Sequence, residues 1–334
     1  MNNIAKKAYY ANGNLIISGE YFVILGGLSL AVPLRFGQTL QVEQGEGDKN
    51  TISLNAYIMN KPWLSAEFGR DNFDIIRTSN VTGIQLIRKI LVAAKEIKPG
   101  FPDQEGHLIM RTNTEFSTAW GWGSSAALIA NIAHWSGTDP FILHRHVSNG
   151  SGYDIAAALS FSPVLYSNRN GDPVIRPVIF DPPFSDRIFF VYLGKKVNSE
   201  KNIQLHMGKL VHYKKLLPTM GEITKKFVYE KDINRYMYLM REHESLISDV
   251  IQTQPVKNEL FGDFKGEIKS LGAWGGDFVM AVSHEPDTYV NRYFRNKNMN
   301  VIYRFSDLIG QKTYGEHKTK AGKSFIEPLH FLYP

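Results

Sequence analysis

The residues best suited to chemistry lie in one glycine- and serine-rich segment, residues 117–127, which reads STAWGWGSSAA. Gly121 and Gly123 carry no side chain, so the backbone there can turn tightly and approach a ligand. Ser124 and Ser125 then open an apolar helical pattern that ends near Gly137. The N–H groups and the dipole at a helix start attract phosphate. The segment therefore predicts a phosphate-binding loop.

A simpler interpretation of the same segment is a glycine turn with a serine N-cap on a core helix. Gly-x-Gly alone favours that interpretation, but Gly-x-Gly-Ser-Ser-Ala-Ala before a helix of small residues is much more specific. The loop is not a P-loop of the Gly-Lys-Ser/Thr type, because no lysine follows the glycines.

Two further segments combine glycine with a carboxylate. Residues 150–158 read GSGYDIAAA, in which small residues leave room for a ligand beside Asp154. The alternative is that Asp154 only caps a short helix over residues 155–159, which is the commoner use of aspartate. Residues 272–277 read GAWGGD and are equally consistent with a turn that leads into a strand.

Composition and charge limit the function classes. The chain has 334 residues, 43% of them hydrophobic and 21% charged, which is ordinary for a globular protein of one or two domains. The net charge of +6 suits a small anionic ligand. Basic residues are scattered, so we expect no nucleic-acid partner. The longest apolar run, residues 21–34, is too short and interrupted to cross a membrane. Zero cysteines and a polar N-terminus fit a cytoplasmic protein.

The elements that must hold these segments alternate between strands and helices. Residues 14–18 and 28–42 are predicted strands joined by a turn at Gly26 and Gly27, and residues 82–98 form an amphipathic helix. Residues 172–183 carry four prolines and suit a domain junction. Beyond the junction we expect strands over residues 188–193 and 278–283, and helices over residues 200–217 and 232–253. This mixture predicts an α+β protein of two lobes.

The three glycine segments, in this order, resemble the motifs of the GHMP kinases, the superfamily of galactokinase, homoserine kinase, mevalonate kinase and phosphomevalonate kinase. Residues 12–24, NGNLIISGEYFVI, resemble the first motif; residues 121–127 match Gly-Leu-Gly-Ser-Ser-Ala-Ala; residues 272–276 resemble the third motif. The segment around Asp154 is most similar to the phosphomevalonate kinase branch and to a group of GHMP kinases marked by Gly-Tyr-Asp-Ile-Ala.

The resemblance implies an N-terminal, ATP-binding lobe like ribosomal protein S5 domain 2 over residues 1–184. It implies a ferredoxin-like lobe over residues 185–334. Asp154 resembles the catalytic aspartate that orients or deprotonates the acceptor hydroxyl, and Ser125 resembles the serine that binds Mg²⁺ with ATP. The ATP-binding residues implied are Gly121, Trp122, Gly123, Ser124, Ser125 and Ala126. The substrate-binding residues implied are Glu20, Gly152, Tyr153, Gly272, Ala273 and Gly275.

The chain departs from the family pattern in three ways. In the family, the lysine of the first motif supports the aspartate and the transferred phosphate. Here it is replaced by Asn14, so another lysine substitutes or catalysis is weak; the candidates are Lys6, Lys7, Lys195 and Lys196. No magnesium-binding glutamate precedes Asp154. His144 and His146 lie two residues apart on a predicted helix, point to different faces, and are predicted to be surface or packing residues. Trp122 and Trp274 replace smaller residues, and either stack on the nucleotide or narrow the phosphate path.

The expected function is therefore a GHMP-type kinase that uses ATP and Mg²⁺ to phosphorylate a small anionic acceptor, with a mevalonate-pathway compound as the leading choice. One alternative is a catalytically impaired relative that binds nucleotide and acts as a sensor, which Asn14 favours. A second is a diphosphate decarboxylase of the same superfamily, which release of carbon dioxide from mevalonate diphosphate would separate from a kinase.

Overall fold

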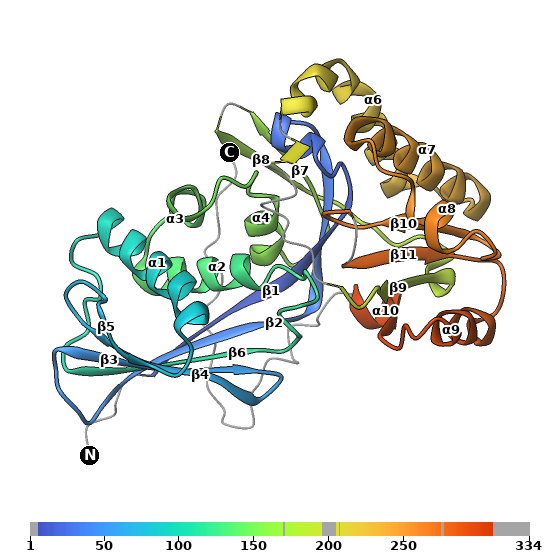
Figure 1. Cartoon of the computed structure of the whole chain (residues 1–334). Helices are drawn as coiled ribbons and strands as arrows, with labels where there is room; N and C mark the ends of the chain where they lie inside the picture. The colour runs from blue at the N-terminus through green and yellow to red at the C-terminus, as the bar shows by residue number, and fades with distance from the viewer. Residues whose placement is uncertain (1–5, 170, 196–204, 207, 275–276, 310–334) are drawn as a thin grey trace.

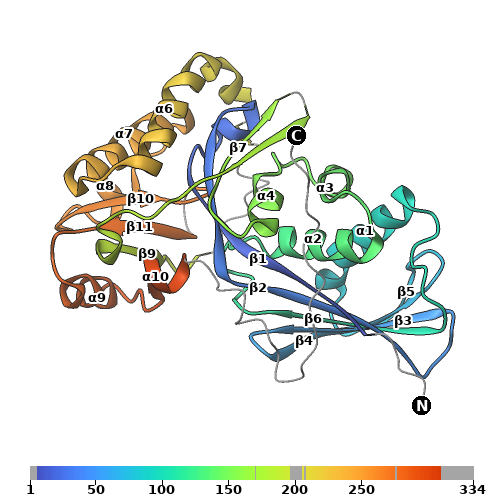
Figure 2. The same cartoon turned by 180° about the vertical axis from the view of Figure 1, so that it is seen from behind.

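Two β-sheets of unequal size organise the computed structural model, which describes residues 6–169, 171–195, 205–206, 208–274 and 277–309. The larger sheet lies in the N-terminal half, and helices cover one of its faces (Figure 1). Seen from behind, the long strands β1 and β2 run from this sheet to the C-terminal half (Figure 2). The α+β class expected from the sequence is confirmed.

The larger sheet has eight strands in the order β5-β4-β3-β6-β2-β7-β8, with β1 also paired to β2. Only β3 and β6 run parallel; the other pairs are antiparallel. The bounds are β1 Lys7–Ser18, β2 Ser29–Gly45, β3 Thr51–Ile58, β4 Lys61–Gly69, β5 Ile75–Thr78, β6 His107–Thr114, β7 Val164–Arg169 and β8 Asp172–Pro177.

Alternation of side chains fixes which face of the larger sheet is buried. In β3, Leu54 and Ala56 are buried, whereas Asn55 and Tyr57, which alternate with them, are half-buried. The buried face packs against α1 Val81–Ile97, α2 Ser124–Ser136 and α4 Tyr153–Leu159, and α3 Pro140–Val147 packs on these three helices. The amphipathic pattern of α1 places Ile84, Ile87 and Leu91 in this core, and its N-cap Asn80 accepts a hydrogen bond from the backbone N–H of Gly83.

The smaller sheet has four antiparallel strands in the order β10-β11-β9-β12. Alternate residues of β9 and β11 pack toward α8 and α9 on one side, and toward α6, α7 and the larger sheet on the other. The bounds are β9 Ile188–Tyr192, α6 Leu217–Tyr229, α7 Ile233–Ile251, α8 Val256–Leu260, β10 Glu267–Ser270, β11 Phe278–Val282, α9 Asp287–Asn296, β12 Ile302–Arg304 and α10 Phe305–Leu308. Short 3₁₀ turns occupy η1 Phe22–Leu25, η2 Ser185–Arg187 and η3 Val211–Leu216.

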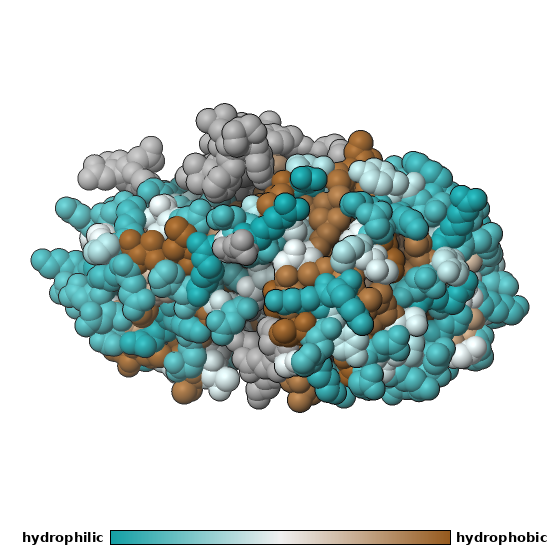
Figure 3. All heavy atoms as spheres, turned by 90° about the horizontal axis from the view of Figure 1, so that it is seen from above, coloured by the Kyte–Doolittle hydropathy of each residue, from teal (hydrophilic) through white to brown (hydrophobic). Residues whose placement is uncertain are grey.

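One hydrophobic cluster joins the two halves. It contains Ile17 and Val32 from β1 and β2 together with Phe190 and Met280 from β9 and β11. The chain passes from the larger to the smaller sheet between β8 and β9, and the predicted division at residues 184/185 falls in that segment. On the face shown in Figure 3, hydrophilic residues cover most of the surface, and hydrophobic residues gather toward the middle of the molecule.

The structure corrects two expected elements. The proline-rich segment from residue 172 begins as β8, because an edge strand tolerates proline where no ladder N–H is needed. A helix was expected over residues 200–217. Residues 205–206 and 208–210 are helical and lead into η3, while residues 200–204 lie outside the described residues. The segment after Leu217 forms α6, because Pro218 stands in its first turn, where proline starts a helix rather than ending it.

Candidate active site

The glycine-serine segment forms a loop that ends at the start of α2. Gly121 and Gly123 adopt left-handed backbone conformations, with φ of 68° and 69°. Gly123 is the N-cap, and the first helical hydrogen bond runs from Ala127 N to its carbonyl at 3.0 Å. The N–H groups of a first turn have no intrahelical acceptors, and no side chain caps them here. Ser125 is exposed beside them. This helix start can therefore hold an anion.

The side chain of Trp122 points away from this ligand-binding side. It is 1% exposed, and its ring lies 5.2 Å from that of Tyr303 and 5.1 Å from that of Phe278, both in the smaller lobe. The expectation that Trp122 stacks on a nucleotide or narrows the phosphate path is therefore wrong for its side chain, because the indole is part of the core between the lobes. Only the backbone of Trp122 remains available to a ligand.

Asn14 lies between the loop and the Asp154 segment. Its backbone N–H donates to Trp122 O at 3.0 Å, and its amide nitrogen donates to the backbone oxygen of Asp154 at 3.3 Å. A Cβ atom placed on Gly123 would overlap the Asn14 amide, so glycine is required there. Asn14 thus joins two predicted site segments through neutral contacts, where the family pattern has a charge.

Asp154 lies in the first turn of α4, whose N-cap is Gly152 rather than Asp154. The side chain is 31% exposed. One carboxylate oxygen, Oδ1, accepts a hydrogen bond from Ile155 N at 3.1 Å and lies 3.9 Å from Nε2 of His144. The partly exposed carboxylate at the start of a helix can be reached by an acceptor, and Asp154 is not the N-cap of that helix.

Glu20 lies in a buried cluster of charged residues that crosses between the lobes. Oε1 of Glu20 is 2.5 Å from Lys269 Nζ on β10, and Oε2 is 2.8 Å from His243 Nε2 on α7. Next to His243, Glu244 accepts a hydrogen bond from Ser270 N at 3.1 Å. All four side chains are at most 3% exposed. Because both oxygens of Glu20 face buried partners, the residue does not contact an acceptor directly, which corrects its expected role.

The tautomer of His243 follows from its two neighbours. Nε2 lies 2.8 Å from the Glu20 carboxylate and 3.2 Å from the backbone N–H of Gly19. One ring nitrogen cannot donate to the carboxylate and accept from the amide at once. The carboxylate is closer, so we assign the Nε2–H tautomer, donating to Glu20.

Burial and mutual attraction set the charges of this cluster. Burial by itself would raise the pKa of Glu20, but Lys269 and His243 lower that pKa to about 2. Burial, aided by Lys269, lowers the pKa of His243 to about 4. Burial raises the pKa of Glu244 to about 8 against the opposing effect of Lys269. At pH 7 the cluster therefore holds one carboxylate, one ammonium and two neutral groups, with no net charge.

Tyr153 connects the buried cluster to Asp154. Burial first, and then the carboxylates of Asp154, Glu20 and Asp277, raise the pKa of its hydroxyl. The Tyr153 hydroxyl therefore stays protonated among three acidic residues. Gly152 adopts φ of 88°, and a Cβ there would lie 3.0 Å from the hydroxyl oxygen of Tyr166. Gly152 and Tyr153 therefore lie directly beside Asp154 at the start of α4, and their role in binding a substrate stays a prediction.

The third glycine segment lies against the first two. The Asp277 carboxylate, 8% exposed, would be 2.5 Å from a Cβ atom on Gly121. Gly272 has a left-handed φ of 67°, and Ala273 is buried; Gly275 lies outside the described residues. Trp274 is 4% exposed within a cluster that includes Tyr21 and Met220, so it packs in the core rather than on a nucleotide.

The lysines considered as substitutes for the family lysine lie in different places. Lys7 begins β1, seven residues from Asn14, or about 23 Å along a strand. Lys6 lies 3.8 Å from Glu43 at that same distant end. Neither reaches the loop, so both expectations are wrong. Lys195 is exposed two residues after Leu193, whose N–H donates to Asp277 O at 2.9 Å. Lys196 lies outside the described residues.

Sequence reasoning missed Lys269, His243, Glu244 and Asp277, and it assigned His144 to packing or the surface. A signal was present for His243, because it follows Tyr236 and Met240 on the apolar stripe of α7. A polar residue on such a stripe needs a buried partner. Lys269 lies three residues before the third glycine segment, in a strand that is buried throughout.

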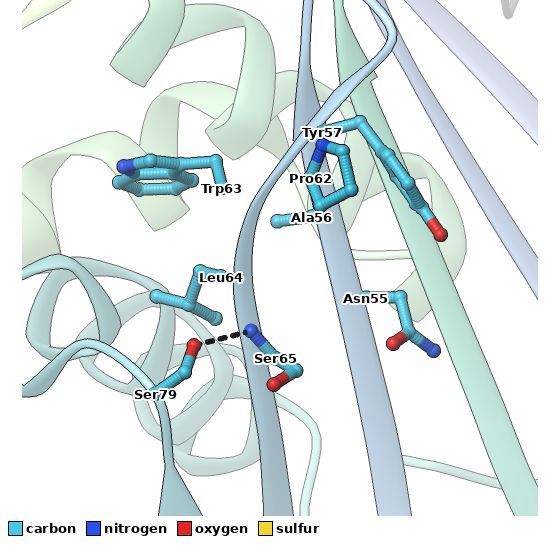
Figure 4. Close-up of a pocket in the computed structure, with 8 residues that line it drawn as sticks. All are labelled: Asn55, Ala56, Tyr57, Pro62, Trp63, Leu64, Ser65 and Ser79. Atoms are coloured by element: carbon cyan, nitrogen blue, oxygen red, sulfur yellow. Dashed lines mark hydrogen bonds between the residues drawn. The ribbon is translucent and has the colours of Figure 1, made fainter.

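Two cavities lie along the larger sheet. One, of about 260 Å³, has the indole of Trp63 and the side chain of Leu64 on one side and Tyr57 and Asn55 on the other, and Ser79 Oγ accepts a hydrogen bond from Ser65 N at 2.9 Å (Figure 4). The other, of about 430 Å³, lies by the β3–β4 turn and is lined by Arg35, Phe36, Met59, Asn60 and Glu115. Neither contains a residue predicted for the site.

The donor set limits how a metal ion can be held. Among the described residues, no group of three or more histidine, aspartate or glutamate side chains is arranged to hold one. The oxygen atoms near the loop are the Ser125 hydroxyl and the carboxylates of Asp154 and Asp277. Oxygen ligands suit Mg²⁺, which usually binds through a few protein groups, water and substrate phosphates. The residues therefore fit Mg²⁺ that arrives with a nucleotide. Within the same residues, no helix is long and apolar enough to span a membrane.

Comparison with known proteins identifies the fold. No protein-family model and no curated protein matches the sequence. The Methanococcus jannaschii mevalonate kinase is similar in structure, with a TM-score of 0.63 and 13% identity over 92% of this chain and 99% of that one. A Streptococcus pneumoniae phosphomevalonate kinase, solved with phosphomevalonate and AMPPNP, has a TM-score of 0.59 and 16% identity over 89% and 99%.

A Lactococcus lactis galactokinase solved with galactose has a TM-score of 0.63 and 12% identity over 92% of this chain and 94% of that one. All three proteins belong to the GHMP kinase superfamily. At these identities the similarity establishes the fold, and it covers both lobes. The resemblance seen in the sequence motifs is thereby confirmed at the level of the fold.

Proposed function

We propose that this chain, which has the GHMP kinase fold, is an ATP-dependent kinase of small molecules. The observation that carries the proposal is the uncapped start of α2, reached through two left-handed glycines and joined by Asn14 to the backbone of Asp154, whose carboxylate is partly exposed. An anion-binding helix start near a partly exposed carboxylate is an arrangement suited to phosphoryl transfer.

The phosphates of ATP would bind the N–H groups of residues 121–126. Ser125 would direct its hydroxyl to Mg²⁺, which neutralises charge on the phosphate oxygens when bound. The Asp277 carboxylate is packed beside Gly121 and would lie near the phosphates and their metal ion.

The nucleobase has a candidate site in the pocket at Trp63. Helices α1 and α2 pack side by side, and at their C-terminal ends Lys98 Nζ donates to Ser136 O at 2.7 Å. Their N-termini therefore lie at the same end of the lobe. Trp63 packs on the first turn of α1, where a Cβ on Gly83 would be 2.8 Å from its ring. Its indole is 39% exposed and offers a surface for stacking a base.

Asp154 would accept the proton of the acceptor hydroxyl. In that step the hydroxyl oxygen forms a bond to the terminal phosphorus, the bond from phosphorus to the ADP oxygen breaks, and the proton passes to the carboxylate. Tyr153, protonated and beside Asp154, can donate a hydrogen bond to the acceptor. Because Lys269 cancels the charge of Glu20, the interior behind Tyr153 does not repel an anionic acceptor.

A mevalonate-pathway acceptor remains the first choice. The Streptococcus pneumoniae phosphomevalonate kinase was solved with phosphomevalonate, and a Leishmania major mevalonate kinase of the same fold was solved with R-mevalonate. The net charge of +6 also favours an anionic substrate.

Acceptor-dependent ADP release tests the proposal. The wild-type chain is assayed with ATP and Mg²⁺ against mevalonate, phosphomevalonate and galactose. Asp154→Asn is expected to lower turnover by roughly 10²-fold or more, because it removes the proton acceptor and keeps the side chain's size. ATP affinity should change little. Asp172→Asn, an exposed aspartate on β8, is the matched control and should behave as wild type.

A nucleotide sensor is the second candidate, and Asn14 is the observation that favours it. Among the described residues, no lysine side chain occupies the position between Gly123 and Asp154 that Asn14 fills. ATP binding without turnover on any acceptor of the panel would favour the sensor over the kinase. Near-normal turnover of Asp154→Asn on a confirmed acceptor would remove Asp154 from the mechanism.

A further inference from the structure

His144 is buried beside Asp154 without another side-chain partner. It lies in the last turn of α3, its side chain is 4% exposed, and Nε2 is 3.9 Å from Oδ1 of Asp154. In the described part of the chain its ring makes no hydrogen bond. An imidazole ring always carries at least one N–H group. If that group is buried without a hydrogen-bond acceptor, the folded state loses free energy. The acidic group that its Nε2 faces is Asp154.

The turn between α3 and α4 is built to let this ring approach. A Cβ atom on Gly150 would lie 3.2 Å from Nε2 of His144, so a larger residue there would crowd the ring. His146, two residues along the same helix, is different: it is exposed, and its Nδ1 lies 2.9 Å from Ile142 O. His144 therefore faces the candidate site and His146 does not, so a variant of His146 can serve as the control for the same variant of His144.

The Asp154 carboxylate needs such a partner because the family lysine is absent. The Asn14 amide donates a hydrogen bond to the backbone oxygen of Asp154 at 3.3 Å and not to its carboxylate, so another residue must orient the carboxylate. The distance of 3.9 Å between His144 Nε2 and Asp154 Oδ1 is longer than a hydrogen bond, which usually measures about 2.7–3.2 Å. Asp154 is partly exposed, so rotation of its side chain can shorten this distance when an acceptor occupies the other oxygen.

We propose that His144 is a positioning residue for Asp154. Its Nε2–H holds one carboxylate oxygen and leaves the second to take the acceptor proton, which replaces the orienting role implied for the missing lysine. This inference rests on the proposed function, in which Asp154 is the proton acceptor.

The kinetic test compares three variants with wild type on the confirmed acceptor. His144→Leu fills the space without an N–H, His144→Gln keeps an N–H near the position of Nε2, and His146→Leu is the matched control. We expect His144→Leu to lower kcat about 10-fold or more with KM for ATP and acceptor within about 2-fold, because alignment of the proton acceptor acts on the chemical step. His144→Gln should recover part of the loss, and His146→Leu should match wild type.

Equal kcat values for His144→Leu and His146→Leu would overturn the proposal, as would a loss confined to KM. If His144→Leu does not fold, as judged by thermal unfolding, the comparison of His144→Gln with His146→Gln carries the test. A lower kcat in His144→Gln, which keeps only part of the contact, with wild-type kcat in His146→Gln is the supporting result, and equal kcat values in the two would overturn the proposal. A kcat loss in His146→Gln as large as that of any His144 variant would also contradict it.

A second measurement does not depend on kinase activity. Protein labelled with ¹⁵N in histidine is compared as wild type and as Asp154→Asn. We expect the ring nitrogen signals of His144 to move while those of His146 stay, because only His144 faces the altered carboxylate. Unmoved His144 signals would overturn the inference. Moved signals in a protein that phosphorylates no acceptor would support the His144–Asp154 contact and reject the proposed kinase.

Discussion

Lys269 Nζ lies 2.5 Å from Oε1 of Glu20, although 249 positions separate the two residues. One follows β1 of the larger lobe and the other belongs to β10 of the smaller one, and both are buried. The pair therefore forms only when the lobes are packed together, and it places a charged contact in the interior directly behind the candidate site.

Breaking this pair should destabilise the protein strongly. Lys269→Met leaves the Glu20 carboxylate buried with only neutral His243 beside it, which should lower the free energy of unfolding by about 3–5 kcal/mol. Chemical denaturation measures the loss. The double variant Glu20→Gln with Lys269→Met should recover much of it, because no uncompensated charge remains.

The control for that experiment is Lys265→Met. Lys265 is 68% exposed and lies 3.4 Å from Glu285, so its loss should change the free energy of unfolding by less than about 1 kcal/mol. A Lys269→Met protein no less stable than Lys265→Met would show that the buried contact is not formed in solution.

Glu244 should make stability fall as pH rises. Its pKa is raised to about 8 in the folded protein from the usual 4.5, so between these pH values the folded state binds a proton that the unfolded state has lost. The contribution of Glu244 to the free energy of unfolding is fully present below pH 4.5 and is lost as the pH rises to 8. Glu244→Gln should remove that decline and be more stable than wild type near pH 8, as measured by unfolding across pH 5–8.

Glu242→Gln, an exposed neighbour on α7, provides the comparison and should keep the wild-type pH dependence. An unchanged pH slope in Glu244→Gln would mean that Glu244 is already ionised in the folded protein. His243 acts in the opposite sense: its pKa is lowered to about 4, so its contribution to stability is lost as pH falls from 6.5 to 4.

Ser125→Ala should weaken nucleotide binding only when Mg²⁺ is present. The hydroxyl is exposed at the start of α2, so its removal should leave the thermal stability unchanged. Loss of one oxygen contact predicts a roughly 3- to 10-fold lower affinity for AMPPNP with Mg²⁺ by calorimetry. With EDTA the two proteins should bind alike. An equal loss under both conditions would argue against metal binding by this serine.

Trp63→Ala should weaken ATP binding by roughly 5-fold or more, because stacking of one base on an aromatic ring is worth about 1–3 kcal/mol. The affinity for inorganic triphosphate should not change, since only the base reaches this pocket. Tyr229→Ala removes an aromatic ring that is 64% exposed in the other lobe and should affect neither ligand. Equal weakening of ATP and triphosphate would reject the pocket as the base site.

Local patterns predicted those parts of the fold in which the signal is local. The helix over residues 82–98 appears as α1, and the strand over residues 28–42 appears within β2, because hydrophobic periodicity and glycine turns operate over a few residues. The start of α2 at Ser124 was also predictable, since Gly123 must leave the helical conformation there. The helix α6, which begins at Leu217 with Pro218 in its first turn, was not predicted as a separate element.

The contents of the site were less predictable because they come from distant parts of the chain. Glycine spacing located the loop and Asp154, but the partners of Glu20 depend on how α7 and β10 pack, which no local pattern encodes. The same limit explains the errors at Lys6 and Lys7, which are near Asn14 in sequence and distant along a straight strand. Trp122 was misplaced because its position in the loop says nothing about which way its ring turns.

Trp122 has a consequence for the energetics of the whole molecule. Its backbone belongs to the segment proposed to bind the phosphates of ATP, while its ring packs against Tyr303 and Phe278 of the other lobe. On that proposal, ligand binding and packing of the two lobes involve the same peptide unit. A ligand present at 100 times its Kd would add about 2.7 kcal/mol to the stability of the folded state. Because the two lobes share that unit, this gain would hold them together as well as keep each one folded.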